Sequence, residues 1–101
     1  MTITTFRNIM TKQLKKQGIP ETSIMKNCHF GYTKKLYPYV GTGISRAGHK
    51  AFIFYDDTMP YVPYTLYIYD KKDNHIATYR TATAKEILDT MFSAIFEILN
   101  K

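Results

Sequence analysis

Side chains that could do chemistry are sparse in this chain, and their spacing matches no known catalytic pattern. Asp56 and Asp57 are adjacent carboxylates, and His49 and His75 stand beside expected turns. Carboxylates near a histidine can act as general acid and base. Adjacent aspartates are also common turn formers, and no nucleophile stands at a set spacing from a base. The sequence therefore favours a non-enzymatic protein, with a small enzyme that uses a loop Asp/His site as an alternative.

Metal and phosphate chemistry is only weakly indicated. Cys28, His29, His49 and His75 do not form a C-x-x-C or H-x₃-H pair, so no local pair of metal ligands exists. The segment Gly41-Thr42-Gly43 lacks the G-K-[ST] ending of a phosphate loop, and no helix is expected after it. Glycines in a bent strand explain that segment better. We expect no metal and no cofactor.

Positive charge is concentrated in the first half of the chain. Residues 1–50 hold nine Lys and Arg against one acidic residue, a net charge of +8, whereas residues 51–101 hold five against seven, a net charge of −2. This asymmetry suits nucleic acid or an acidic protein surface, although a solvated face that confers solubility would give the same pattern. The candidate contacts are the following basic residues: Lys12, Lys15, Lys16, Lys34, Lys35, Arg46 and Lys50.

Tyrosines gather in the segment YVPYTLYIYD, residues 61–70, which holds four of the nine in the chain. Side chains alternate between the two faces of a strand, so this cluster must divide. Tyr67 and Tyr69 share one face. The other face is expected to be core and holds Tyr64, Leu66 and Ile68.

The expected return strand extends the face of Tyr67 and Tyr69. If the KKDN turn has an even loop length, Thr78 and Arg80 join that face. Aromatic rings and an arginine on an open sheet can stack single-stranded bases, and tyrosines equally suit protein interfaces. Tyr67, Tyr69 and Arg80 therefore complete the candidate binding site.

Hydrophobic periodicity predicts an α+β domain over residues 1–101, with a three- to four-stranded antiparallel meander and a long C-terminal amphipathic helix packed on the sheet. The T-x-x-E pattern from Thr83 to Glu86 predicts the start of that last helix. The expected helices are Thr5–Gln17, Pro20–Asn27 and Ala84–Asn100. The expected strands are Tyr39–Ser45, Lys50–Tyr55, Tyr64–Asp70 and His75–Arg80.

The first two helices outline a helix-turn-helix around Gly18. Gln13 and Gln17 stand where a tightly packed pair would need apolar residues, so a plain helical hairpin is favoured over insertion into a DNA groove. A homodimer formed through a tyrosine face, or through a sheet edge near Tyr61–Pro63, stays open.

The composition places the protein in the cytoplasm. No apolar run reaches the roughly 20 residues that a membrane span needs, no signal-peptide pattern opens the chain, and Cys28 is alone. We expect a small binding protein that modulates or inhibits a protein acting on nucleic acid. A phage or mobile-element accessory that blocks a host defence nuclease, of the anti-CRISPR or anti-restriction type, fits this description. The alternative is direct, sequence-tolerant binding of DNA or RNA through the basic N-terminal half.

Overall fold

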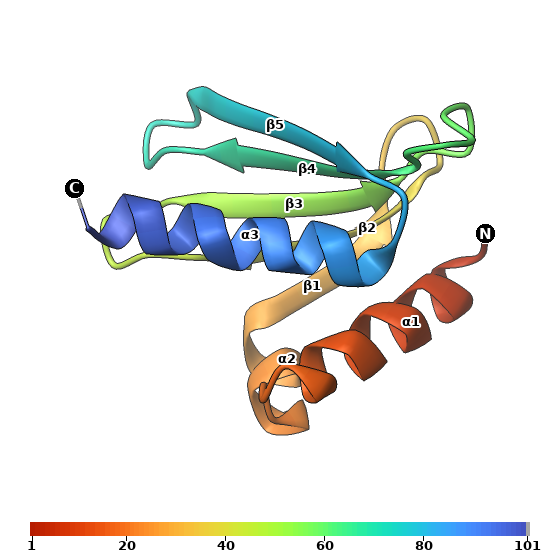
Figure 1. The fold of residues 1–101 in the computed structure, drawn as a ribbon, viewed down its shortest axis with the longest axis horizontal. Helices are drawn as coiled ribbons and strands as arrows, with labels where there is room; N and C mark the ends of the chain where they lie inside the picture. Colours follow the sequence, from red (N-terminus) through yellow and green to blue (C-terminus); the bar gives the residue numbers. More distant parts are fainter. Residues whose placement is uncertain (101) are drawn as a thin grey trace.

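Three helices and five strands make up the computed structural model, which describes residues 1–100 (Figure 1). The α+β class is confirmed, and the long C-terminal helix packs on the sheet as predicted. None of the helices in residues 1–100 is long and apolar enough to cross a bilayer. In chain order the elements are α1 (Ile3–Lys16), α2 (Glu21–Asn27), β1 (Cys28–Tyr32), β2 (Pro38–Gly43), β3 (Lys50–Tyr55), β4 (Tyr64–Tyr69), β5 (His75–Thr81) and α3 (Ala84–Leu99).

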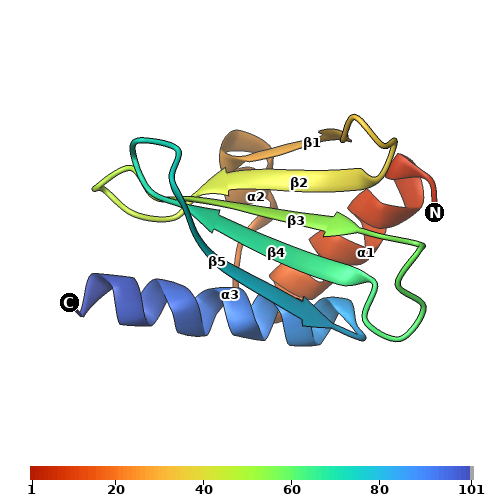
Figure 2. The same cartoon turned by 90° about the horizontal axis from the view of Figure 1, so that it is seen from above.

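The sheet is an antiparallel meander in the order β1-β2-β3-β4-β5 (Figure 2). The expected count of three to four strands is wrong, because Cys28–Tyr32 also forms a strand. That segment reads CHFGY, in which Gly31 separates the two aromatic residues and weakens the strand signal. Pairing with β2, which sets Phe30 opposite Val40, makes it a strand.

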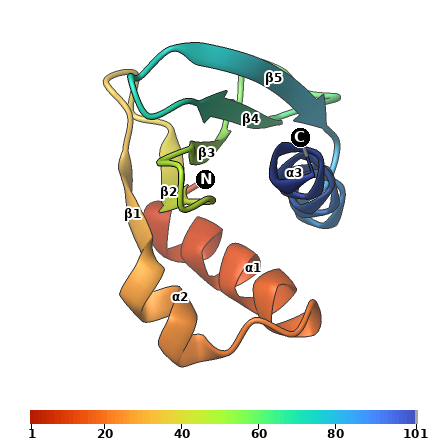
Figure 3. The same cartoon turned by 90° about the vertical axis from the view of Figure 1, so that its left-hand side faces the viewer.

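Both long helices lie on the same side of the sheet (Figures 1 and 3). α1 contacts β1 and β2, while α3 contacts β4 and β5. The core lies between these layers and includes the fully buried side chains Phe6, Met10, Ile53, Leu66, Ile68, Ile87 and Leu88. Within residues 1–100, no helix covers the other side of the sheet, so that face is open (Figure 2).

Local signals set the ends of these elements. The Thr83 hydroxyl oxygen accepts a hydrogen bond from the Glu86 amide at 3.2 Å, as the cap pattern predicts. Gly18 ends α1 with a φ of +88°, a conformation that glycine adopts without steric cost. In the β4–β5 turn, the Asp70 carboxylate accepts hydrogen bonds from the Lys72 and Asn74 amides, both at 2.9 Å. These local features mark the start of α3, the end of α1 and the β4–β5 turn.

Candidate functional site

The register of β3 against β4 decides which aromatic side chains share the open face. Phe52 stands opposite Tyr67, whereas Ile53 stands opposite the buried Leu66. Phe52, Phe54, Tyr67 and Tyr69 therefore point away from the helices. The predicted division of the tyrosine cluster is confirmed. Its core members are all buried: Tyr64 (6% exposed), Leu66 (0%) and Ile68 (1%).

The rings on the open face touch one another and form a continuous surface. Phe54 meets Tyr67 edge-to-face with ring centroids 5.2 Å apart, and Phe52 meets Tyr69 in the same way at 5.7 Å. Tyr39 of β2 approaches Phe52 at 6.2 Å, and Tyr37 lies parallel to Phe54 at 6.1 Å. We call these rings the aromatic surface, and its members are Tyr37, Tyr39, Phe52, Phe54, Tyr67 and Tyr69.

Two glycines make room for this surface. A Cβ at Gly41 would lie 2.8 Å from a ring carbon of Phe52, and a Cβ at Gly31 would lie 3.0 Å from the Tyr39 ring. Gly41 belongs to β2 and pairs with both neighbouring strands. The lack of a side chain at Gly41 therefore lets Phe52 lie across β2.

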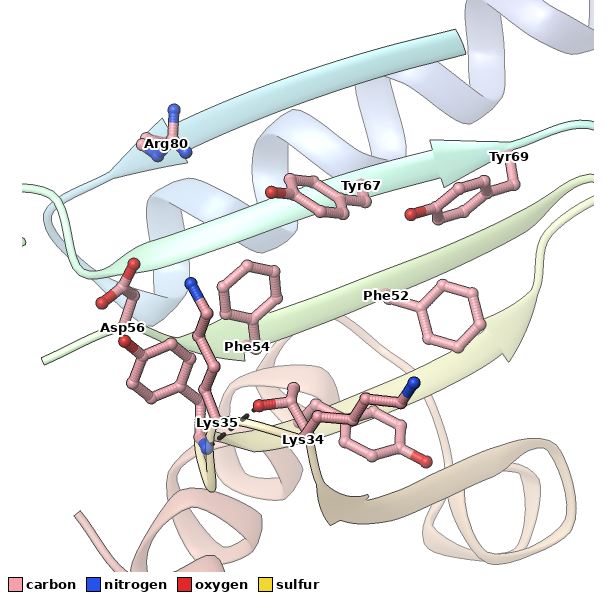
Figure 4. Close-up of a pocket in the computed structure, with 11 residues that line it drawn as sticks. Lys34, Lys35, Phe52, Phe54, Asp56, Tyr67, Tyr69 and Arg80 are labelled. Carbon is pink, nitrogen blue, oxygen red and sulfur yellow. Dashed lines mark hydrogen bonds between the residues drawn. The ribbon is translucent and has the colours of Figure 1, made fainter. Parts of the chain in front are cut away.

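Positive side chains flank the aromatic surface on two sides. Lys34 and Lys35 come from the β1–β2 loop, and Arg80 comes from β5, with Phe54 and Tyr67 between them (Figure 4). Together they border an open basin of about 770 Å³ whose floor is the aromatic surface. Within residues 1–100, none of these three cations takes part in an ion pair. The basin therefore offers apolar ring area with free positive charge at its rim.

Asp56 is the single acidic residue among those that line the basin. Its Oδ1 atom accepts hydrogen bonds from the Thr58 amide at 3.0 Å and from the Thr58 hydroxyl at 2.5 Å. Partial burial acts to raise the pKa of Asp56, but the bonds from Thr58, a bond from the Tyr37 hydroxyl and the charge of Arg80 outweigh it and lower that pKa. Asp56 is therefore ionised at neutral pH and held in a fixed orientation.

Thr65 is a buried polar residue on the same face as the aromatic surface. It stands opposite Phe54 on one side and Arg80 on the other, and it is fully buried. Its hydroxyl has no hydrogen-bond partner among residues 1–100. Such a group lowers the free energy of unfolding by roughly 1–3 kcal/mol, so Thr65 reduces the stability of the sheet beside the basin.

The structure brings together half of the residues that the sequence nominated. Lys34, Lys35, Tyr67, Tyr69 and Arg80 all line the basin. The remaining candidates, all basic, lie elsewhere: Lys12, Lys15 and Lys16 on α1, Arg46 in the β2–β3 turn, and Lys50 at the start of β3.

The lysines outside the basin lie on the opposite face of the sheet or form ion pairs. α1 covers the face opposite the basin, so its lysines cannot join the rim (Figure 1). Lys15 pairs with Glu21 at 2.9 Å, and Lys50 pairs with Asp73. The basic N-terminal half therefore does not form one continuous surface.

The side chains considered for catalysis or metal binding are not assembled. His49 and Asp56 flank opposite ends of β3, a six-residue strand about 20 Å long. The His49 Nδ1 atom is hydrogen-bonded to the Ser45 hydroxyl at 2.7 Å. Cys28 is half-buried, and burial raises the pKa of its thiol. Within residues 1–100, no three His, Cys, Asp or Glu side chains gather in an arrangement suited to a metal ion.

Four members of the aromatic surface were missed by sequence reasoning: Tyr37, Tyr39, Phe52 and Phe54. A usable signal existed for two of them, since Phe52 and Phe54 alternate as a strand face should. No protein family, curated protein or solved structure matches this chain.

Proposed function

We propose that this protein is a non-enzymatic binding protein whose ligand is a single-stranded nucleic acid held on the open face of the sheet. The observation that carries the proposal is the aromatic surface bordered by Lys34, Lys35 and Arg80. Bases stack on aromatic side chains, each contributing about 1–3 kcal/mol, and cations beside them hold the phosphates. The basin supplies both groups on one accessible face.

Unpaired strands suit this surface better than a duplex does. In a duplex the π-faces of the bases are stacked inside, so that rings on the surface of a sheet reach only phosphates and groove edges. The rings of Phe54 and Tyr67 present broad apolar area at the floor of the basin rather than a projecting helix or ribbon. The proposal therefore predicts a preference for single strands.

A second candidate partner is a protein that acts on nucleic acid, which this chain would modulate or inhibit through the same face. Asp56 favours it, because a carboxylate in the basin repels phosphate but suits a protein surface of mixed charge. Tyrosine and arginine are also the residue types that dominate binding energy at protein interfaces.

Fluorescence anisotropy with labelled oligothymidine, oligouridine and a duplex at low salt tests the first candidate. We expect both single strands to bind more tightly than the duplex. Tyr67→Ala should weaken binding by about tenfold, within the range for one lost stacking contact, whereas Tyr67→Phe should retain it. The matched control is Tyr61→Ala, since Tyr61 is 87% exposed and lies outside the basin.

Two results would overturn this candidate. One is the absence of binding by any single strand at low salt, which would leave a protein partner as the candidate. The other is an equal loss of affinity in the Tyr61 and Tyr67 variants. Thermal melting of each variant separates a lost contact from a lost fold, because Tyr67 is half-buried.

A further inference from the structure

Asp56 has a position that general phosphate binding does not explain. It begins the β3–β4 connection and lines the basin together with the rim cations and the rings (Figure 4). A carboxylate at this place weakens the attraction of the rim for phosphate. If the basin holds a single strand, Asp56 must either lower the affinity of the basin for that strand or contact a part of the nucleotide other than the phosphate.

The two hydrogen bonds that Thr58 donates to Asp56 occupy one oxygen of the carboxylate. Both bonds from Thr58 go to Oδ1, at 3.0 Å from the amide and 2.5 Å from the hydroxyl. These bonds fix the plane of the group, while Oδ2 receives neither of them. An ionised carboxylate has about four acceptor positions and no donor. Asp56 thus presents a fixed acceptor beside a surface on which bases can stack.

The Watson–Crick edges of the bases differ in how they meet such an acceptor. Guanine offers two adjacent donors, N1–H and the N2 amine. Adenine and cytosine each offer one amine beside a ring nitrogen that is itself an acceptor and repels a carboxylate. Thymine and uracil offer one N–H between two carbonyl oxygens. Proteins read unpaired bases by hydrogen bonds on these edges while the rings stack.

We propose that Asp56 makes the basin select guanine among unpaired bases. This inference rests on the proposed function, since it assumes that a single strand lies on the aromatic surface. Phe54 and Tyr67 would support the base, the Oδ2 atom of Asp56 would accept from its adjacent N1–H and N2 amine, and the rim cations would hold the flanking phosphates.

Oligothymidines that carry one central guanine, inosine, adenine or cytosine test this selection by fluorescence anisotropy. We expect guanine to bind about tenfold more tightly than adenine or cytosine, in the range of one good contact to a base edge. Inosine lacks the N2 amine and should lose part of that preference. Asp56→Asn, which replaces one acceptor by a donor, should abolish the preference without loss of the fold in a melting experiment.

Asp57→Asn is the matched control, because it removes the same charge from an exposed neighbour that does not line the basin. It should keep the preference for guanine. Equal affinity for all four oligonucleotides would overturn the selection and leave the proposed function intact. Tighter binding of every sequence by Asp56→Asn would also overturn it, since Asp56 would then act only by repelling phosphate. Failure of all strands to bind would instead refute the proposed function.

Discussion

Replacing Lys34 and Lys35 by glutamine measures how the basin holds phosphate. For single strands, each phosphate contact contributes about −0.7 to the slope of log affinity against log salt, because bound counterions are released. Lys34, Lys35 and Arg80 together predict a slope of about −2. Removing both lysines leaves about −0.7, so a tenfold rise in salt should weaken the variant about fivefold and the wild type about a hundredfold.

The assay is an anisotropy titration of one labelled oligothymidine at several salt concentrations. The control variant is Lys12→Gln with Lys16→Gln, which removes the same charge from α1. Both residues are exposed, and neither takes part in an ion pair within residues 1–100. Since α1 covers the opposite face of the sheet, we expect this control to keep the wild-type slope.

Equal reduction of the slope by both double variants would refute the reasoning. Net charge, and not the basin, would then determine affinity. An unchanged slope in the Lys34 and Lys35 variant would also refute it, because phosphate would have to be held elsewhere. The lysines of α1 would in that case become the leading contacts.

Two further predictions concern stability. Thr65→Val replaces an unpartnered buried hydroxyl by a methyl group of similar shape, so urea unfolding should show about 1 kcal/mol more stability; a decrease would mean that the hydroxyl is bonded. Bonds from the Asn74 side chain and backbone, together with the Lys72 amide, lower the pKa of Asp70. Its stabilisation is thus present above the unfolded pKa and lost as pH falls through the folded pKa. Asp70→Asn should melt below the wild type at neutral pH and match it in acid; a constant difference would contradict this.

The faces of β4 and β5 were predictable from the sequence because short-range rules determine them. Alternation alone separates Leu66 and Ile68 from Tyr67 and Tyr69. The β4–β5 pairing sets Tyr67 opposite Thr78 and Leu66 opposite Tyr79, as expected, although the connection has five residues and a register shift between Ile68 and Tyr69 restores the expected faces. Where a hairpin turn is short, its geometry fixes pairing and so fixes which side chains share a face.

The other half of the aromatic surface depends on longer connections. Residues 56–63 join β3 to β4, and a connection of that length does not fix the pairing of the strands from local sequence. Alternation sets Phe52 and Phe54 on one face of their strand, but it does not tell which side of the sheet that face is on. β1 posed a related problem, since only pairing with β2 makes Cys28–Tyr32 a strand.

The charge of the candidate site illustrates why a linear count of charged residues misleads. The first half of the chain has a net charge of +8, yet α1 takes three of its lysines to the face opposite the basin. The rim instead combines Lys34 and Lys35 with Arg80, which comes from the acidic half. A meander sets β5 three strands away from β2, so the β1–β2 loop and the end of β5 flank the rings of β3 and β4. Topology therefore decides which charges act together. The affinity for single strands should depend on these three cations and not on the net charge of either half of the chain.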